Sequence, residues 1–291
     1  MKLSIDNGML LARFGVFESM RMIKDAGFDC VDMTYYTVPM DSPLLNDGYA
    51  EYAVKLKEYL LSIGLECNQA HAPFVFSYGD KFKPEDPHYR AIVRSIESAA
   101  ILGAKEIVVH SVGHRQGETV LFDRGYNLDY YRSLIPYCEK FDIRIAVENL
   151  VEHQHDGGFV GRLGTPQELT EFVEELDSPW FCACLDTGHA SLSGVKPEDF
   201  VAGMRTDLLQ VLHVHDGDYL GDRHTLPYLM DFNWSNIMTA LKRIGYDGEL
   251  TFEILNYFRN IPLELIPASL RFAEQTGRYL IGIYKKTEIE A

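Results

Sequence analysis

The feature that most constrains this chain is a repeating order of apolar strand, loop, amphipathic helix and glycine. Helical patterns end at the four glycines 27, 64, 103 and 245, and each is followed by a short apolar run. Alternation of strands and helices predicts a parallel sheet, and eight such units in one chain predict a closed (β/α)8 TIM barrel. The eight expected strands begin near Lys2, Cys30, Leu65, Glu106, Ile143, Phe181, Leu209 and Glu249.

The alternative to a barrel is an open doubly wound sheet. No Gly-x-Gly-x-x-Gly and no P-loop follows any of the expected strands, which removes the usual nucleotide-binding signatures. The chain has 291 residues, no low-complexity segment and no evident linker, so we expect a single α/β domain over residues 1–291. This domain corresponds to one TIM barrel.

Several helix starts are marked by capping residues. Asp86-Pro87 and the capping box Thr165-Pro166-Gln167-Glu168 predict two of them, and Asn127 and Asn233 predict two more. Pro136 falls inside the helix expected at residues 128–140, where it predicts a kink or a late start.

Composition narrows the classes of function. The chain carries 27 Lys and Arg against 43 Asp and Glu, a net charge of −16, which disfavours nucleic acid and anionic membranes as partners. No apolar stretch reaches the length of a membrane span, and the first residues lack a signal-peptide core, so we expect a cytoplasmic protein. The five cysteines do not suggest a disulfide framework. Cys182-x-Cys184 is interpreted as a pair of buried thiols, with metal binding as the less favoured alternative.

Side chains two residues apart on a strand face the same side of the sheet. On the fifth expected strand Arg144, Ala146 and Glu148 share one face, and the β-branched residues share the other. The mixed face should point into the barrel and the β-branched face should pack on the helices. The same alternation predicts these other inward residues: Cys67, Gln69 and His71; Cys182, Cys184 and Asp186; Val211 and His213; Thr251 and Glu253.

Six strand ends therefore carry a side chain of a metal-ligand type at the mouth where barrel enzymes keep their active sites. They are His71, His110, Glu148, Asp186, His213 and Glu253. Three carboxylates close together repel one another unless a cation neutralises them. The set Glu148, Asp186, His213 and Glu253 suits one divalent ion of Mn²⁺, Mg²⁺, Co²⁺ or Zn²⁺.

The order of motifs resembles the sugar-phosphate isomerase/epimerase superfamily of xylose isomerase-like barrels, which includes ketose 3-epimerases and relatives of endonuclease IV. The resemblance runs from His71 to Glu253. It is carried by His71-Ala-Pro-Phe, His110, Glu148-Asn149, Leu185-Asp186-Thr-Gly-His189-Ala, His213-x-His215-Asp216, Asp222-x-His224 and Glu253. It implies that Glu148, Asp186, His213 and Glu253 hold one divalent ion and that Glu148 and Glu253 are also the catalytic acid/base pair.

The implied activity is a metal-dependent isomerase or epimerase that moves a proton next to the carbonyl of a sugar or a sugar-like polyol. Such a reaction needs one base to remove the proton, a second on the opposite face of the carbon to return it, and an electrophile beside the carbonyl. The expected partner is therefore a small carbohydrate. Large barrels of this kind often associate, which leaves a homo-oligomer open. The residues expected to bind substrate are His71, His110, His189, His215, Asp222 and His224.

Two alternative reactions stay open on the same site, besides a non-catalytic binding protein, which the loss of Glu148 or Glu253 would have favoured. One is a sugar dehydratase of the inosose type. The other, less favoured, is an AP endonuclease with three zinc ions, because nine positions match its ligand types: His71, His110, Glu148, Asp186, His189, His213, Asp222, His224 and Glu253. Two features argue against the nuclease. Gly188 stands where nucleases usually have cysteine, and residues 35–49 after the second expected strand contain acids but no Lys or Arg.

Overall fold

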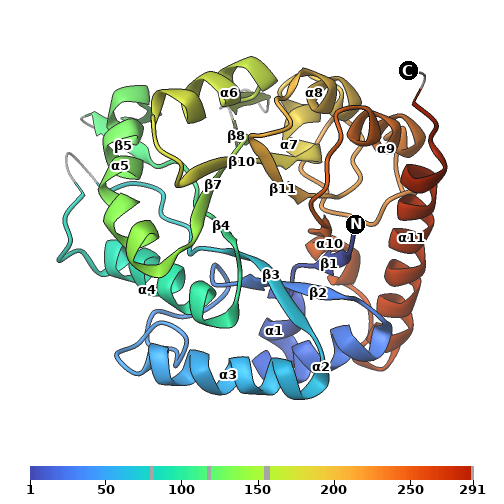
Figure 1. The fold of residues 1–291 in the computed structure, drawn as a ribbon, viewed down its shortest axis with the longest axis horizontal. Helices are drawn as coiled ribbons and strands as arrows, with labels where there is room; N and C mark the ends of the chain where they lie inside the picture. Colours follow the sequence, from blue (N-terminus) through green and yellow to red (C-terminus); the bar gives the residue numbers. More distant parts are fainter. Residues whose placement is uncertain (79–81, 117–118, 154–157, 290–291) are drawn as a thin grey trace.

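Eight parallel strands form a closed ring in the computed structural model, which describes residues 1–78, 82–116, 119–153 and 158–289 (Figure 1). Six strands make one sheet in the order β11-β10-β7-β4-β3-β2, and β1 pairs with β12. Bridges from Asp6 to Asp32 and from Val214 to Phe252 close the ring. The strands are β1 (Leu3–Ile5), β2 (Cys30–Thr34), β3 (Glu66–His71), β4 (Glu106–Val108), β7 (Arg144–Glu148), β10 (Phe181–Asp186), β11 (Leu209–His213) and β12 (Leu250–Phe252). The predicted TIM barrel and its eight strands are confirmed.

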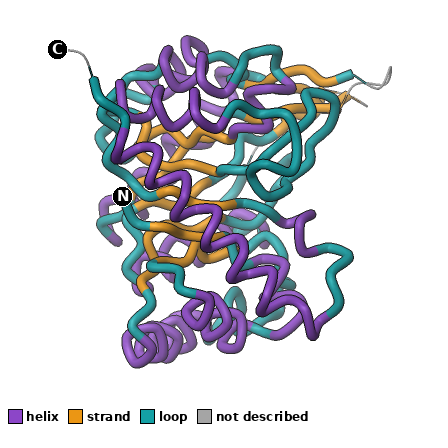
Figure 2. The backbone as a smooth tube through the Cα atoms, turned by 90° about the vertical axis from the view of Figure 1, so that its right-hand side faces the viewer, coloured by secondary structure: helices purple, strands orange, loops and turns teal. Residues whose placement is uncertain are grey.

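Helices surround the strands, and the longer loops gather at one end of the barrel (Figure 2). The helices are α1 (Gly8–Phe14), α2 (Val16–Ala26), α3 (Tyr49–Ile63), α4 (Pro87–Leu102), α5 (Arg124–Phe141), α6 (Pro166–Glu175), α7 (Thr187–Leu192), α8 (Pro197–Gly203), α9 (Trp234–Arg243), α10 (Leu255–Phe258), the 3-10 helix η1 (Leu263–Leu265) and α11 (Ile266–Lys286). Within the described ranges, no helix has both the length and the apolar character needed to cross a membrane.

The predicted helix ends depend on local chemistry and are largely confirmed. Gly27, Gly64 and Gly103 cap their helices with left-handed φ angles of 106°, 67° and 104°, which glycine adopts without steric cost. Gly245, with φ 74°, follows Ile244, the C-cap residue of α9. Asp86 caps α4, the capping box of Thr165 and Glu168 opens α6, and Asn233 caps α9.

The prediction for Asn127 was wrong. Asp123 caps α5 by accepting a hydrogen bond from the backbone N–H of Tyr126, so Asn127 lies inside the helix. Its amide side chain instead holds both the N–H and the C=O of Val112 in the loop after β4. Pro136 also lies inside α5, which starts at Arg124, so the proline does not delay the helix.

The barrel interior and the helix-facing core are separate clusters. Interior packing consists of Val108, Ala146, Cys182, Cys184 and Val211, which confirms the predicted inward face of β7, β10 and β11. Both cysteines are free buried thiols whose pKa is raised by burial, and neither belongs to a candidate metal group of the described residues.

The inward assignment of Cys67 was wrong. The pairing of β2 with β3 shifts register after Cys67, which belongs to the core cluster shared with the helices. Asn68 takes the inward place and contacts Ser4 and Thr251 through its side chain. A bulge reverses the alternation of the residues before it, and sequence alternation alone does not reveal a bulge.

Two antiparallel hairpins, absent from the sequence prediction, extend the mouth of the barrel. The first pairs β5 (Gly113–Gln116) with β6 (Thr119–Phe122) after β4, and the second pairs β8 (Leu150–His153) with β9 (Phe159–Arg162) after β7. The second hairpin begins directly after Glu148 and Asn149, so it forms part of the wall around the strand ends.

Candidate active site

The carboxyl ends of the strands bring the expected site residues together at one mouth. His71, Glu148, Asp186 and His213 are the last residues of β3, β7, β10 and β11, and Glu253 follows β12 directly. All are buried, with relative exposures of 0% to 5%. His110 lies two residues beyond β4 and is half-buried. Alternation on each strand explains why the last inward residue points at the barrel axis.

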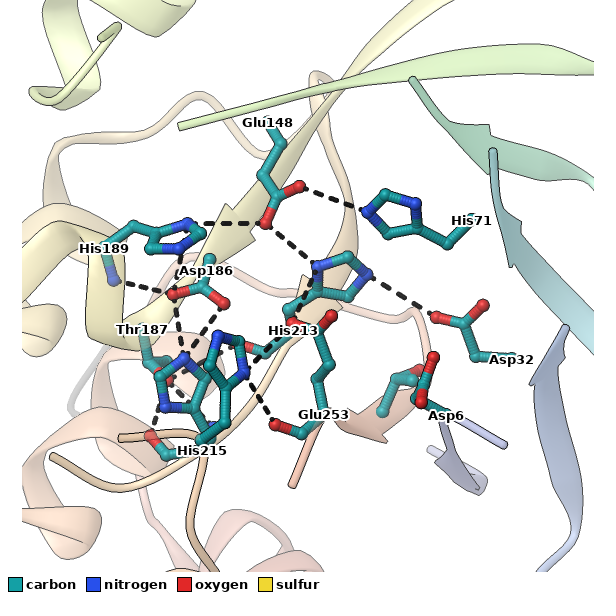
Figure 3. Close-up of polar contacts among 12 residues, drawn as sticks. Asp6, Asp32, His71, Glu148, Asp186, Thr187, His189, His213, His215 and Glu253 are labelled. Carbon is teal, nitrogen blue, oxygen red and sulfur yellow. Dashed lines mark hydrogen bonds and ion pairs between the residues drawn. The ribbon is translucent and has the colours of Figure 1, made fainter. Parts of the chain in front are cut away.

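Glu148, Asp186, His213 and Glu253 form the densest group. One ligand atom from each lies within 4.8 Å of the others. Nδ1 of His213 is 3.0 Å from Oε1 of Glu148 and 3.4 Å from Oε2 of Glu253 (Figure 3). The ion pairs of these three carboxylates within the described ranges are all with histidines. A buried set of three carboxylates and one imidazole fits a divalent cation.

Burial and the neighbouring charges move the pKa values of the carboxylates apart. Burial raises the pKa of Glu253 to about 7 against the opposing charges of His213 and His224. Burial also acts on Glu148, but there the charge of His213 and hydrogen bonds from neighbouring histidines outweigh it and hold the pKa well below its ordinary value. The two glutamates thus sit in different electrostatic surroundings, which hold their pKa values apart.

His71 and His110 converge on the other oxygen of Glu148. Nε2 of His71 is 3.7 Å from Oε2 of Glu148, Nε2 of His110 is 2.9 Å from it, and the two Nε2 atoms are 3.1 Å apart. Nδ1 of His71 lies 2.9 Å from the carbonyl of Ala72, so an N–H at that position leaves the Nε2 lone pair directed at the site. His71, Glu148 and His213 form a second group with metal-ligand geometry.

A third group adjoins Asp186 through His189, whose Nδ1 is 3.6 Å from Oδ1 of Asp186. Nε2 of His189 is 3.7 Å from Oδ2 of Asp222, and Nε2 of His224 is 3.0 Å from Oδ1 of the same carboxylate. His189, Asp222 and His224 together have metal-ligand spacing. The nine positions that match the nuclease ligand types therefore all meet at one mouth.

His215 occupies a different environment from the other expected substrate-binding residues. Its side chain is fully buried, and Nε2 lies 3.1 Å from both carboxylate oxygens of Asp186, while Nδ1 is 3.3 Å from the carbonyl of Asp216. The ring of His224 stacks on it at 4.0 Å. Both ring nitrogens of His215 thus face protein groups, and the geometry favours a role in orienting Asp186 over contact with substrate.

Gly188 makes this position of His215 possible. A Cβ atom at residue 188 would lie 2.0 Å from Cε1 and 2.7 Å from Nε2 of the imidazole. Any side chain larger than hydrogen at this position would force the ring of His215 or the backbone at residue 188 to shift.

Two acidic residues of the site were missed by the sequence analysis. Asp32 on β2 lies with Oδ2 3.5 Å from Nε2 of His213 and accepts a hydrogen bond of 2.7 Å from Gln69. Asp6, at the end of β1, accepts hydrogen bonds from Thr34 and Tyr36. The sequence could have indicated both residues, because Asp6 ends an apolar strand run, as Glu148 does, and Asp32 interrupts one.

Other polar residues of the motifs build the scaffold. Asn149 bonds both the N–H and the C=O of Asp186 and thereby ties the ends of β7 and β10 together. Asp216 accepts hydrogen bonds from the backbone N–H groups of Met230 and Phe232 and from the indole of Trp234. The aspartate of the His213-x-His215-Asp216 motif therefore orders the loop after β11.

An open cleft of 790 Å³ leads to the ligand groups. Histidines and carboxylates line its floor, and its walls contain Phe74, Phe76 and Phe159. Phe74 stacks on Tyr36 at 4.5 Å and on His110 at 4.7 Å. A cleft with an apolar wall and convergent polar groups is typical of a small-molecule site.

The fold and the ligand groups define a barrel of the xylose isomerase type, and comparison with known proteins agrees. The family's sequence profile, described as the xylose isomerase-like TIM barrel, matches residues 20–276. This chain belongs to that family.

Among curated relatives, an uncharacterized protein of Methanocaldococcus jannaschii is 27% identical over 254 residues, covering 82% of this chain and 78% of its own length. A probable endonuclease 4 of Staphylococcus carnosus is 27% identical over 228 residues, covering 71% of this chain and 67% of its own length.

Among solved structures, a D-tagatose 3-epimerase-like protein superposes with a TM-score of 0.73 at 20% identity, covering 98% of this chain and 99% of that one. The IOLI protein with a bound zinc atom superposes with a TM-score of 0.75 at 16% identity, covering 99% and 100%. At these identities the structural likeness concerns the fold.

Proposed function

We propose that this protein is a divalent-metal-dependent isomerase or epimerase of a sugar or sugar-like polyol. The observation that carries the proposal is the placement of Glu148 and Glu253, which approach the same buried set from β7 and from the end of β12 with Asp186 and His213 between them (Figure 3). Solved structures of the same fold include proteins described as ketose 3-epimerases, which supports this assignment.

The two glutamates supply the proton transfers. One removes the proton from the carbon next to the carbonyl, and the other returns a proton to the opposite face of that carbon. A divalent cation held by Glu148, Asp186, His213 and Glu253 would polarise the carbonyl and an adjacent hydroxyl. His110, His189, Asp222 and His224, which line the cleft, would hydrogen-bond substrate hydroxyls. His71 is buried beside Glu148, and His215 would hold Asp186 in place.

The experiment is a deuterium-exchange screen. Ketoses, sugar acids and inosose-type substrates are incubated in D₂O with Mn²⁺ and the protein, and incorporation of deuterium at a single carbon identifies the reaction. Loss of water instead of exchange identifies the dehydratase alternative. Glu148→Gln and Glu253→Gln should each lose nearly all turnover, whereas Glu264→Gln in the exposed η1 should retain it. Full activity in either site variant would show that the two-base mechanism is wrong.

A trinuclear phosphoesterase is the second candidate, because four overlapping groups with metal-ligand spacing lie around Glu148, Asp186 and Asp222. Arg162 is the one Lys or Arg among the described residues that line the cleft, and it is paired with Glu152. Duplex nucleic acid needs several cations along its phosphates. Three zinc ions per chain together with cleavage of abasic duplex DNA would favour this candidate over the epimerase.

A further inference from the structure

The wall of the cleft carries an ion pair that the proposed proton transfers do not use. Glu152 lies on β8 and Arg162 ends β9. The register pairs Glu152 with Val160 and Arg162 with Leu150, so both charged side chains stand on the same face of the hairpin. They form an ion pair with side-chain exposures of 26% for Glu152 and 17% for Arg162, and both line the cleft.

The base of this hairpin is held against helix α7. A Cβ atom at Gly161 would lie 2.5 Å from Oγ of Ser193, and one at Gly164 would lie 2.6 Å from the same atom. Only glycine allows so close an approach on both sides of Arg162. Since α7 also carries His189, the ion pair is fixed relative to the polar floor of the cleft.

The electrostatics of the cleft disfavour an anionic substituent beside this pair. The described lining contains the carboxylates of Glu148, Glu152, Asp222 and Glu253, and the charge of Arg162 is already neutralised by Glu152. A phosphate or carboxylate on the substrate would have to displace Glu152 and would then leave that carboxylate unpaired in a half-buried wall.

An Arg–Glu pair suits hydroxyl groups better. The guanidinium offers N–H donors and the carboxylate offers acceptor oxygens, so a hydroxyl, which both donates and accepts, is satisfied by the pair without breaking it. Leu150, which pairs with Arg162 on the same face of the hairpin and also lines the cleft, adds an apolar surface for the C–H side of a polyol.

We propose that the Glu152–Arg162 pair binds hydroxyls of the substrate away from the reacting carbon and excludes substrates that carry a phosphate or carboxylate there. This inference rests on the proposed sugar isomerase or epimerase function and narrows it to neutral, unphosphorylated polyols. The negative charge of Glu152 repels an anionic substituent. When that charge is removed, Arg162 becomes free to bind the anion.

The test compares free ketopentoses and ketohexoses with their terminal phosphates, using the Mn²⁺-loaded full-length protein. Deuterium exchange measures turnover, and calorimetry measures binding. The wild-type protein should prefer the free sugars. Glu152→Gln keeps the shape of the side chain but frees Arg162, so the ratio of phosphate to free sugar should rise by about tenfold or more in kcat/KM and in affinity. The double variant Glu152→Gln/Arg162→Gln should lose this gain.

A matched control is Glu175→Gln, which opens the exposed pair of Glu175 and Arg124 outside the cleft and should leave the ratio unchanged. A wild-type preference for phosphorylated sugars, an unchanged ratio in Glu152→Gln, or no binding of any sugar would overturn the inference. The two proposals fail separately. If the protein binds free sugars selectively but exchanges no deuterium, only the epimerase function is wrong. If it exchanges deuterium but Glu152→Gln leaves the ratio of phosphate to free sugar unchanged, only the role of the ion pair is wrong.

Discussion

Nε2 of His213 lies 3.5 Å from Oδ2 of Asp32, on the opposite side of the ring from the contact between Nδ1 and Glu148. A carboxylate behind a metal-binding imidazole fixes its tautomer and orientation. An N–H at Nε2 facing Asp32 leaves the lone pair of Nδ1 directed at the other carboxylates. Asp32 is therefore a positioning residue for the proposed metal set.

Asp32→Asn should weaken binding of Mn²⁺ by about 10-fold to 100-fold, because His213 loses the charge that orients it. Calorimetric titration of the metal-free protein measures this change, and circular dichroism checks the fold. Asp25→Asn, in an exposed ion pair on α2, serves as the control. An unchanged affinity in Asp32→Asn would mean that Asp32 has no part in the metal set.

Gly188→Ala should destabilise the protein by about 1–3 kcal/mol, because its new Cβ would overlap the ring of His215. Truncating that ring in the double variant Gly188→Ala/His215→Ala removes the overlap, so the double variant should be more stable than the sum of the two single changes implies. Urea unfolding of all four proteins measures the coupling. Strictly additive effects would contradict the contact.

Metal binding should stabilise the fold, since a cation held by Glu148, Asp186 and Glu253 is absent from the unfolded chain. At about 100 times the dissociation constant the gain is about 2.7 kcal/mol. Thermal unfolding with and without a chelator measures it, and Glu253→Gln should reduce the gain. Elemental analysis should find one tightly bound ion per chain. If a chelator leaves the thermal stability of the wild-type protein unchanged, the proposed metal site is wrong.

Asp6 should make stability depend on pH. Burial, followed by the charge of Asp32, raises the pKa of Asp6 to about 6, above its ordinary value of 3.8. The folded state therefore holds this proton more tightly than the unfolded state, so the contribution of Asp6 is present below pH 3.8 and is lost as the pH rises through about 6. Relative to wild type, Asp6→Asn should lose less stability between pH 4 and pH 7. The free energy of unfolding in urea is measured at each pH for both proteins. If it changes with pH equally in the wild type and in Asp6→Asn, the raised pKa of Asp6 is wrong.

Much of this protein could be predicted from sequence, because the determining interactions are local. Glycines after helices, Asp86 and Thr165 before them, and apolar runs of strand length each act within a few residues. Period-two alternation then directs Glu148 and Asp186 inward, and a parallel barrel places all strand ends at one mouth.

Other features depended on contacts between distant parts of the chain. The bulge that turns Cys67 outward arises from its pairing with β2, and the capping role expected for Asn127 was taken by Asp123 when Asn127 bonded the loop after β4. Tertiary structure also decided that His215 faces Asp186, that Asp32 stands behind His213 and that Arg162 meets Glu152. Sequence specifies which groups are present and on which face of a strand they lie. Their partners are set by strand pairing in the hairpins and by the assembly of the barrel, which bring residues separated by ten to more than a hundred positions within a few ångströms.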